Sequence, residues 1–105
     1  MIITSDKPFQ SNLVNTYISL SSLAMDLKRV ALGYHRGSDQ MANKFLEEAM
    51  KRKDEIHQND VKPYIFDLLS KIELLSSEKD ILKRAEDSLL YSTLFQNASL
   101  KLNTQ

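Results

Sequence analysis

Apolar residues recur at alternating intervals of four and three along the first third of the chain, with polar residues such as Asp26 and Arg29 on the opposite side. This spacing is that of one face of an α-helix, and it predicts a helix over residues 10–36. Gly37 suits the left-handed position that closes many helices. The repeating apolar positions are Leu13, Tyr17, Leu20, Ala24, Leu27, Ala31 and Tyr34.

Three further helices are predicted after this one. The second covers residues 39–58, where the apolar stripe is thin and most of the circumference faces water. The third covers residues 61–75 and repeats the four-three spacing after a break that contains Pro63. The fourth covers residues 78–98 and begins after Ser77, which opens the segment SEKD, a relative of the capping box.

These four helices cover about four-fifths of the chain, against about one-third in an average soluble protein. Their short connections favour antiparallel neighbours. The sequence therefore predicts an all-α fold, an antiparallel four-helix bundle that forms a single domain over residues 1–105. The alternative is that residues 39–75 form one helix, bent at Pro63 and packed on the hairpin of the first and last helices.

Composition narrows the class of protein further. Hydrophobic residues make up 42% and charged residues 27% of the 105 residues, which is typical of a folded chain. The absence of cysteine excludes disulfides, thiolate metal sites and thiol nucleophiles, and favours the cytoplasm. No apolar run is long enough for a membrane span, so we expect no membrane association. The 14 basic residues are balanced by 14 acidic ones, so we do not expect a nucleic acid partner.

The predicted helices differ in length, and this predicts a surface for binding protein. The first and fourth, at about 39 Å and 33 Å, are longer than the third, at about 22 Å, which cannot cover them from end to end. On the fourth helix, the apolar residues from Leu89 to Phe95 spread over about 240° of the circumference, wider than one core requires. On the first helix, the apolar face is widened by Leu23, Val30, Val14, Ile18, Met25 and Leu32.

We therefore expect an exposed apolar surface that binds a second copy of the chain, with a homodimer as the simplest form, or another protein. The alternative is a compact monomer that leaves a few aromatic side chains exposed. The residues expected on this surface are Leu90, Tyr91, Leu94, Phe95, Leu23 and Val30.

Each of the two histidines follows an arginine in the sequence. Five residues separate Arg29 from His35, and four separate Arg52 from His57. This spacing resembles the R-x4-6-H motif of HEPN-type helical-bundle ribonucleases. The resemblance implies a dimeric enzyme that acts on RNA, with Arg29 and His35 as candidate catalytic residues at a helix end. The structural alternative is that each histidine interacts with the last carbonyls of its own helix.

The sequence predicts neither a cofactor nor a metal. A di-metal bundle carries two Glu-x-x-His pairs, whereas the nearest approach here is the single pair of Asp54 and His57. No glycine-rich phosphate loop and no nucleophile elbow occurs. The leading interpretation is a non-catalytic cytoplasmic helical bundle that acts by binding protein, and the alternative is a small HEPN-like RNA-processing or toxin-type ribonuclease.

Overall fold

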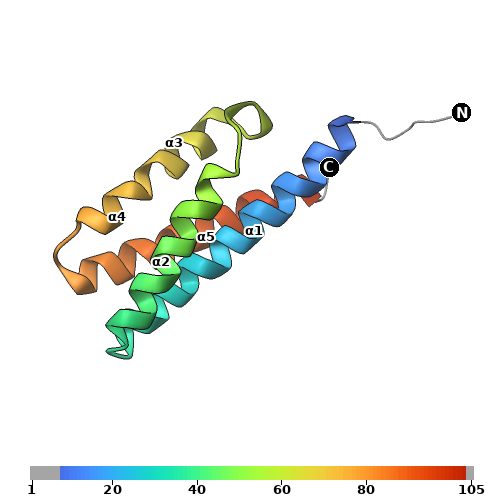
Figure 1. The fold of residues 1–105 in the computed structure, drawn as a ribbon. Helices are drawn as coiled ribbons and strands as arrows, with labels where there is room; N and C mark the ends of the chain where they lie inside the picture. Colours follow the sequence, from blue (N-terminus) through green and yellow to red (C-terminus); the bar gives the residue numbers. More distant parts are fainter. Residues whose placement is uncertain (1–7, 104–105) are drawn as a thin grey trace, which may run out of the picture.

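The computed structural model describes residues 8–103, which fold into five α-helices and one short 3₁₀ helix (Figure 1). The helices are α1 (Pro8–His35), α2 (Asp39–Asp54), η1 (Gln58–Asp60), α3 (Pro63–Lys71), α4 (Glu73–Ser77) and α5 (Ile81–Asn103). Because α3 and α4 follow one another almost end to end in Figure 1, four rods make up the bundle. The predicted all-α bundle is confirmed, and no strand occurs among residues 8–103.

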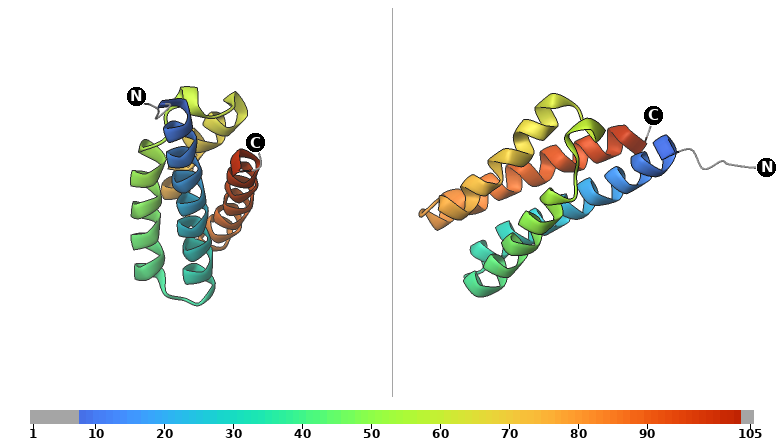
Figure 2. Two further views of the ribbon diagram at one scale, coloured as in Figure 1. Left: turned by 90° about the vertical axis from the view of Figure 1, so that its right-hand side faces the viewer. Right: turned by 45° about the horizontal axis from the view of Figure 1, so that its top comes forward.

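The long helix α1 runs beside both α2 and α5, and consecutive rods run in opposite directions (Figures 1 and 2). At 28 residues, α1 is about 42 Å long. It begins at the end of the bundle where α5 finishes, as Figure 2 shows. As a result, α1 and α5 lie along each other for most of their length.

The turn between α1 and α2 depends on Gly37, as the sequence predicts. Gly37 has a φ of 77°, in the left-handed region that favours glycine. Its N–H donates to the Tyr34 carbonyl at 3.1 Å, and the N–H of Ser38 donates to the Gly33 carbonyl at 2.8 Å. These two bonds form a Schellman motif, which satisfies the last free carbonyls of α1.

The structure separates α2 from α3, so the alternative of one bent helix is wrong. The helix α2 ends at Asp54, four residues before the predicted end, and backbone bonds of the i→i−3 type at Glu55 and Ile56 tighten the turn after it. Lys62 is extended, with φ −67° and ψ 152°, because a residue that precedes proline avoids the helical region. Pro63 then opens α3 in the first turn, where its missing N–H costs nothing.

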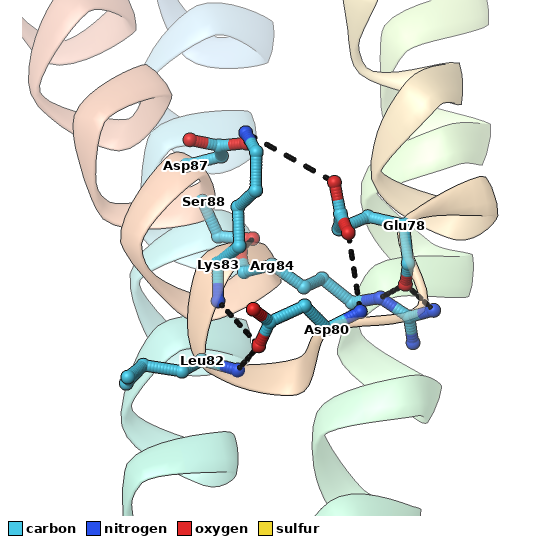
Figure 3. Close-up of polar contacts among 7 residues, drawn as sticks. All are labelled: Glu78, Asp80, Leu82, Lys83, Arg84, Asp87 and Ser88. Carbon is cyan, nitrogen blue, oxygen red and sulfur yellow. Dashed lines mark hydrogen bonds and ion pairs between the residues drawn. The ribbon is translucent and has the colours of Figure 1, made fainter.

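Asp80 provides the side-chain cap of α5 (Figure 3). Its Oδ1 accepts hydrogen bonds from the backbone N–H groups of Leu82, at 3.0 Å, and Lys83, at 3.3 Å. The N–H of Asp80 itself donates to Oε2 of Glu78 at 3.1 Å. Free donors at the start of the helix are thereby paired with carboxylates, which the helix dipole also favours there.

The prediction that Ser77 caps this helix is wrong. Ser77 is the last residue of α4, and Glu78 after it is extended, with φ −73° and ψ 119°. The helix α4 continues through Ser77, and α5 begins at Ile81 instead of residue 78.

Arg84 joins the end of α4 to the other rods. Its Nε donates to the Glu78 carbonyl at 3.0 Å, and its Nη2 donates to the Ser76 carbonyl at 3.3 Å. Its Nη1 donates to the Tyr34 hydroxyl of α1 at 2.9 Å, and that hydroxyl donates to Asn43 of α2. One guanidinium therefore pairs free carbonyls at the end of α4 and fixes the short rod against α1, α2 and α5.

The core lies between the four rods, and α1 contributes the most to it. Small residues let α1 approach its neighbours closely: a Cβ added at Gly33 would lie 2.8 Å from the Cβ of Ala42 in α2. On the other side, Ser92 Oγ of α5 donates to the Ala24 carbonyl at 2.7 Å. The largest fully buried apolar side chains are Leu20, Leu23, Leu27, Val30, Ile72, Leu75 and Phe95.

We expect Asp80→Ala to lower the free energy of unfolding by about 1 kcal/mol, because two backbone donors of α5 lose their acceptor. For a chain of this size, that corresponds to a melting temperature lower by about 4–8 °C. Circular dichroism during thermal unfolding measures it. Ser77→Ala is the matched control and should change stability by less than about 0.5 kcal/mol. A larger loss for Ser77→Ala than for Asp80→Ala would contradict the assignment of the cap.

Candidate interaction surface

Three of the six residues predicted on the interaction surface lie in the core instead. Leu23, Val30 and Phe95 are each 0% exposed. Leu23 and Val30 are buried because α1 lies between α2 and α5, and these neighbours cover a wider part of its circumference than the stripe of four-three positions alone. The width of an apolar face shows that a helix has more than one neighbour, but it does not show which neighbour belongs to the same chain.

The other three predicted residues retain some exposure. Leu90 is 55% exposed, while Tyr91 and Leu94 are half-buried. Tyr91 also packs against the core. The helix predicted to contribute most to the surface therefore does carry exposed apolar residues, but they lie on a different face from Phe95.

A stripe of exposed apolar residues runs along α1. These side chains are 41% to 57% exposed and are separated by four, seven and seven residues, which places them on one face of the helix. Ser21 and Lys28 occupy the intervening positions of the same face. The stripe consists of Val14, Ile18, Met25 and Leu32.

A second stripe runs along α5. Leu82, Leu89 and Leu100 are 44% to 59% exposed, and their spacing also places them on one face. Exposed Glu86 and Thr93 lie between them on this face. This stripe has the same length in residues as the one on α1.

On α1, the exposed stripe lies next to the contact with α5. Ala24 marks this contact, because its carbonyl accepts the hydrogen bond from Ser92. At 100° per residue, Leu27 of the core lies about 60° to one side of Ala24, and Met25 lies about 100° to the other. The α1 stripe therefore lies beyond the α5 contact, away from the core.

The same relation holds on α5, where Ser92 marks the contact with α1. Arg84, which points to the other rods, lies about 80° to one side of Ser92, and Leu89 lies about 60° to the other. Both stripes therefore flank the α1–α5 contact on the outer side of the bundle. We call this surface the α1–α5 face and define it by Val14, Ile18, Met25, Leu32, Leu82, Leu89 and Leu100.

The structure does not bring Arg29 and His35 together within one protomer. Arg29 Nη1 lies 3.7 Å from Asp26, and the guanidinium covers the Phe45 ring at 5.4 Å. His35 is exposed at the last position of α1, about 120° round the helix from Arg29. Among residues 8–103, His35 makes no side-chain hydrogen bond or ion pair, including none to the carbonyls that end α1.

The second pair, Arg52 and His57, also has its two side chains in different surroundings. Arg52 Nε lies 3.6 Å from Asp26 Oδ2, and its Nη1 lies 3.9 Å from Glu55. His57 is exposed and extended after the end of α2. Both arginines of the R-x4-6-H pattern are thus paired with carboxylates of this chain, which competes with binding to a phosphate.

Asp26, which the sequence places on the polar side of its helix, is buried where α2 covers it. Burial raises the pKa of its carboxyl above the ordinary 3.8, and the guanidinium groups of Arg52 and Arg29 offset part of this rise. Neither Asp26 Oδ2 nor Arg52 Nε has a hydrogen bond within 3.5 Å. The cluster is therefore an ion pair with imperfect geometry on the α1–α2 contact, not an open binding site.

A polar hollow is lined by Asn15, Thr16, Ser19, Glu55, His57 and Asp60. No three acidic, histidine or cysteine side chains among residues 8–103 lie close enough together to hold a metal ion. In the same range, no helix has the length and apolar character needed to cross a bilayer. No protein family, curated protein or solved structure matches this chain.

We expect Asp26→Asn to be at least as stable as the wild type at pH 7. Because the pKa of Asp26 is raised on folding, its protonation stabilises the folded state, and this contribution is lost as pH rises through the folded-state pKa. Melting temperatures measured from pH 7 down to pH 3 should show the advantage of the variant shrinking toward acid pH. A wild type that is more stable than Asp26→Asn at pH 7, with a gap that closes in acid, would contradict the direction of the shift.

Proposed function

We propose that this protein is a non-catalytic helical-bundle module of the cytoplasm that acts by binding protein, first of all a second copy of itself, through the α1–α5 face. The observation that carries the proposal is the alignment of seven exposed apolar side chains along one outer side of two adjacent helices. A cytoplasmic location agrees with the absence of cysteine.

The α1–α5 face differs from ordinary scattered exposure. Single apolar residues are common on protein surfaces and need no explanation. Here seven large side chains, each 41% to 59% exposed, follow two parallel lines with helical spacing. Contiguous patches of this kind mark contacts with a partner.

The size of the face suits a reversible dimer. Each stripe spans 18 residues, or about 27 Å, and two adjacent helices are about 20 Å wide. The footprint is therefore on the order of 540 Å² before surface relief is counted, which is at the low end for specific protein interfaces. We expect association at micromolar concentrations.

The charge of the face favours a second copy over an anionic partner. The intervening positions of the two stripes carry one charge of each sign, Lys28 on α1 and Glu86 on α5, and both side chains are exposed. A surface that binds nucleic acid or acidic lipid would carry an excess of basic residues. A face with one charge of each sign can instead pair with a copy of itself.

The test is the mass of the wild type and of Met25→Glu/Leu89→Glu, measured by size-exclusion chromatography with light scattering at tens of micromolar. The wild type should have twice the monomer mass of 12.1 kDa. The variant should be monomeric, because each dimer would bury four carboxylates in place of apolar side chains. We expect its dissociation constant to rise at least about 100-fold, which corresponds to about 3 kcal/mol.

The matched control is Met41→Glu/Leu74→Glu, which changes two residues of similar exposure, 59% and 62%, on α2 and α4. This control should dimerise as the wild type does. A wild type that is monomeric at these concentrations would overturn the proposal. So would a control variant that loses the dimer while Met25→Glu/Leu89→Glu retains it.

A further inference from the structure

The polar hollow lies beside the first half of α1, where α2 ends and η1 begins. Its volume is about 170 Å³, which is more than about ten times the space that one bound water molecule needs. One wall is formed by α1, and the other is formed by the segment that joins α2 to α3. The lining side chains are all polar: Asn15, Thr16 and Ser19 on the α1 wall, and Glu55, His57 and Asp60 on the joining segment.

Thr16 is the most buried residue of the hollow, with 5% exposure. Four serine and threonine side chains are buried among residues 8–103. Ser88, Ser92 and Ser99 each donate to a backbone carbonyl, at 2.7, 2.7 and 2.8 Å. The fourth is Thr16, whose hydroxyl makes no hydrogen bond to any residue of this range. A buried hydroxyl without a partner is unfavourable, because it has given up hydrogen bonds to water.

The hydroxyl of Thr16 is reached from the hollow. In the described part of the chain, the polar side-chain atoms that are both sealed and unpaired are Asp26 Oδ2 and Arg52 Nε, and Thr16 Oγ1 is not one of them. The small surface that Thr16 retains is the surface that lines the hollow. A molecule in the hollow can therefore form the hydrogen bond that residues 8–103 do not supply.

The charge of the hollow selects a cation. Glu55 and Asp60 are acidic, and the described lining residues include no lysine or arginine. Arg52 Nη1 lies 3.9 Å from Glu55 Oε1 and offsets part of that charge, whereas Asp60 makes no ion pair within residues 8–103. A ligand with a positive charge is attracted by both carboxylates, and an anion is repelled.

An ammonium group suits this wall better than a metal ion does. A calcium ion takes about six to eight oxygen ligands, and no three acidic, histidine or cysteine side chains between residues 8 and 103 lie close enough together to hold a metal. An ammonium group has three N–H donors and needs one acceptor for each. The two carboxylates and a ring nitrogen of His57 are acceptors of this kind.

The α1 wall adds neutral groups that can donate and accept hydrogen bonds. The hydroxyls of Thr16 and Ser19 do both, and so does the amide of Asn15. None of these three side chains has a hydrogen bond to another residue of the described chain. A ligand that carries hydroxyl groups beside its ammonium group can therefore pair with both walls.

We propose that this hollow binds a small amino alcohol. Its ammonium group interacts with the carboxylates of Glu55 and Asp60. Its hydroxyl groups form hydrogen bonds with Thr16 and Ser19. The site is separate from the α1–α5 face, because Thr16 lies about 160° round α1 from Ile18. Binding at the hollow therefore does not depend on the proposed self-association.

The test is a titration of ¹⁵N-labelled protein, followed by amide chemical shifts, with three molecules that share a three-carbon skeleton. The first, 2-amino-1,3-propanediol, has an ammonium group between two hydroxyls. Glycerol has a hydroxyl in place of the ammonium group, and 2-aminopropane lacks both hydroxyls. The amino diol should bind with a dissociation constant of about 1 mM and shift amides at residues 15–19 and 55–60. Each of the other two should bind at least about tenfold more weakly, because it leaves one wall unpaired.

Two substitutions test the two walls separately. Asp60→Asn removes a charge and should weaken the amino diol at least about tenfold. Thr16→Val removes the hydroxyl with little change of shape and should weaken it about fivefold. Without ligand, Thr16→Val should unfold at no lower temperature than the wild type, because it removes an unpaired buried hydroxyl. The matched controls are Asp67→Asn and Thr93→Val, at exposed positions of α3 and α5 outside the hollow, which should bind as the wild type does.

Three results would overturn the proposal. The first is an amino diol that shifts no amide at residues 15–19 and 55–60 at about 50 mM, far above the expected dissociation constant. The second is glycerol that binds as tightly as the amino diol, since the carboxylates then contribute nothing. The third is a loss of affinity in Asp67→Asn as large as the loss in Asp60→Asn.

Discussion

The position of α1 between two neighbours is the constraint on which the rest of the structure depends. Gly33 meets Ala42 of α2 on one side, and Ala24 accepts a hydrogen bond from Ser92 of α5 on the other. Because these contacts use small residues, the helix axes approach closely, and larger side chains such as Leu23 and Val30 fill the space toward the remaining rod. Among residues 8–103, no helix covers the side of α1 and α5 that faces away from the α3–α4 rod, because α2 lies on the opposite side of α1 from α5.

The short α3–α4 rod completes the core by a combination of apolar and polar contacts. Ile65, Leu69, Ile72 and Leu75 are buried from this rod. Its end is held by the Arg84 guanidinium, which binds carbonyls of residues 76 and 78, and its side is held by the ion pair of Lys53 and Glu73 at 2.7 Å. A rod of 15 residues needs such contacts because it buries fewer side chains than the long helices do. Hydrogen bonds and ion pairs depend on direction and distance, so these contacts define the position of the rod more closely than apolar packing alone.

The proposed function follows from the face that this arrangement leaves open. Arg29 and Arg52, the arginines of the R-x4-6-H pattern, are both paired with Asp26 at the α1–α2 contact, whereas the apolar side chains on the outer side remain 41% to 59% exposed among residues 8–103. A carboxylate with a raised pKa often marks a catalytic site. Asp26 has such a pKa because it is covered by a neighbouring helix, and the two arginines beside it offset only part of the rise. The proposed binding through an apolar face explains why these large side chains are exposed, whereas a catalytic role for the arginines does not explain it.

The sequence by itself determined the all-α class, the four rods and the glycine that ends α1, because helical periodicity and the left-handed preference of glycine are local properties. It also showed that α1 and α5 carry more apolar residues than one contact requires. Only the tertiary structure decided which of these residues are buried: Leu23, Val30 and Phe95 point inward, while Met25 and Leu89 point outward. It likewise decided that Asp80 and not Ser77 caps α5. The burial of a side chain depends on where a distant rod lies against its helix, and the spacing of residues along one helix does not contain that information.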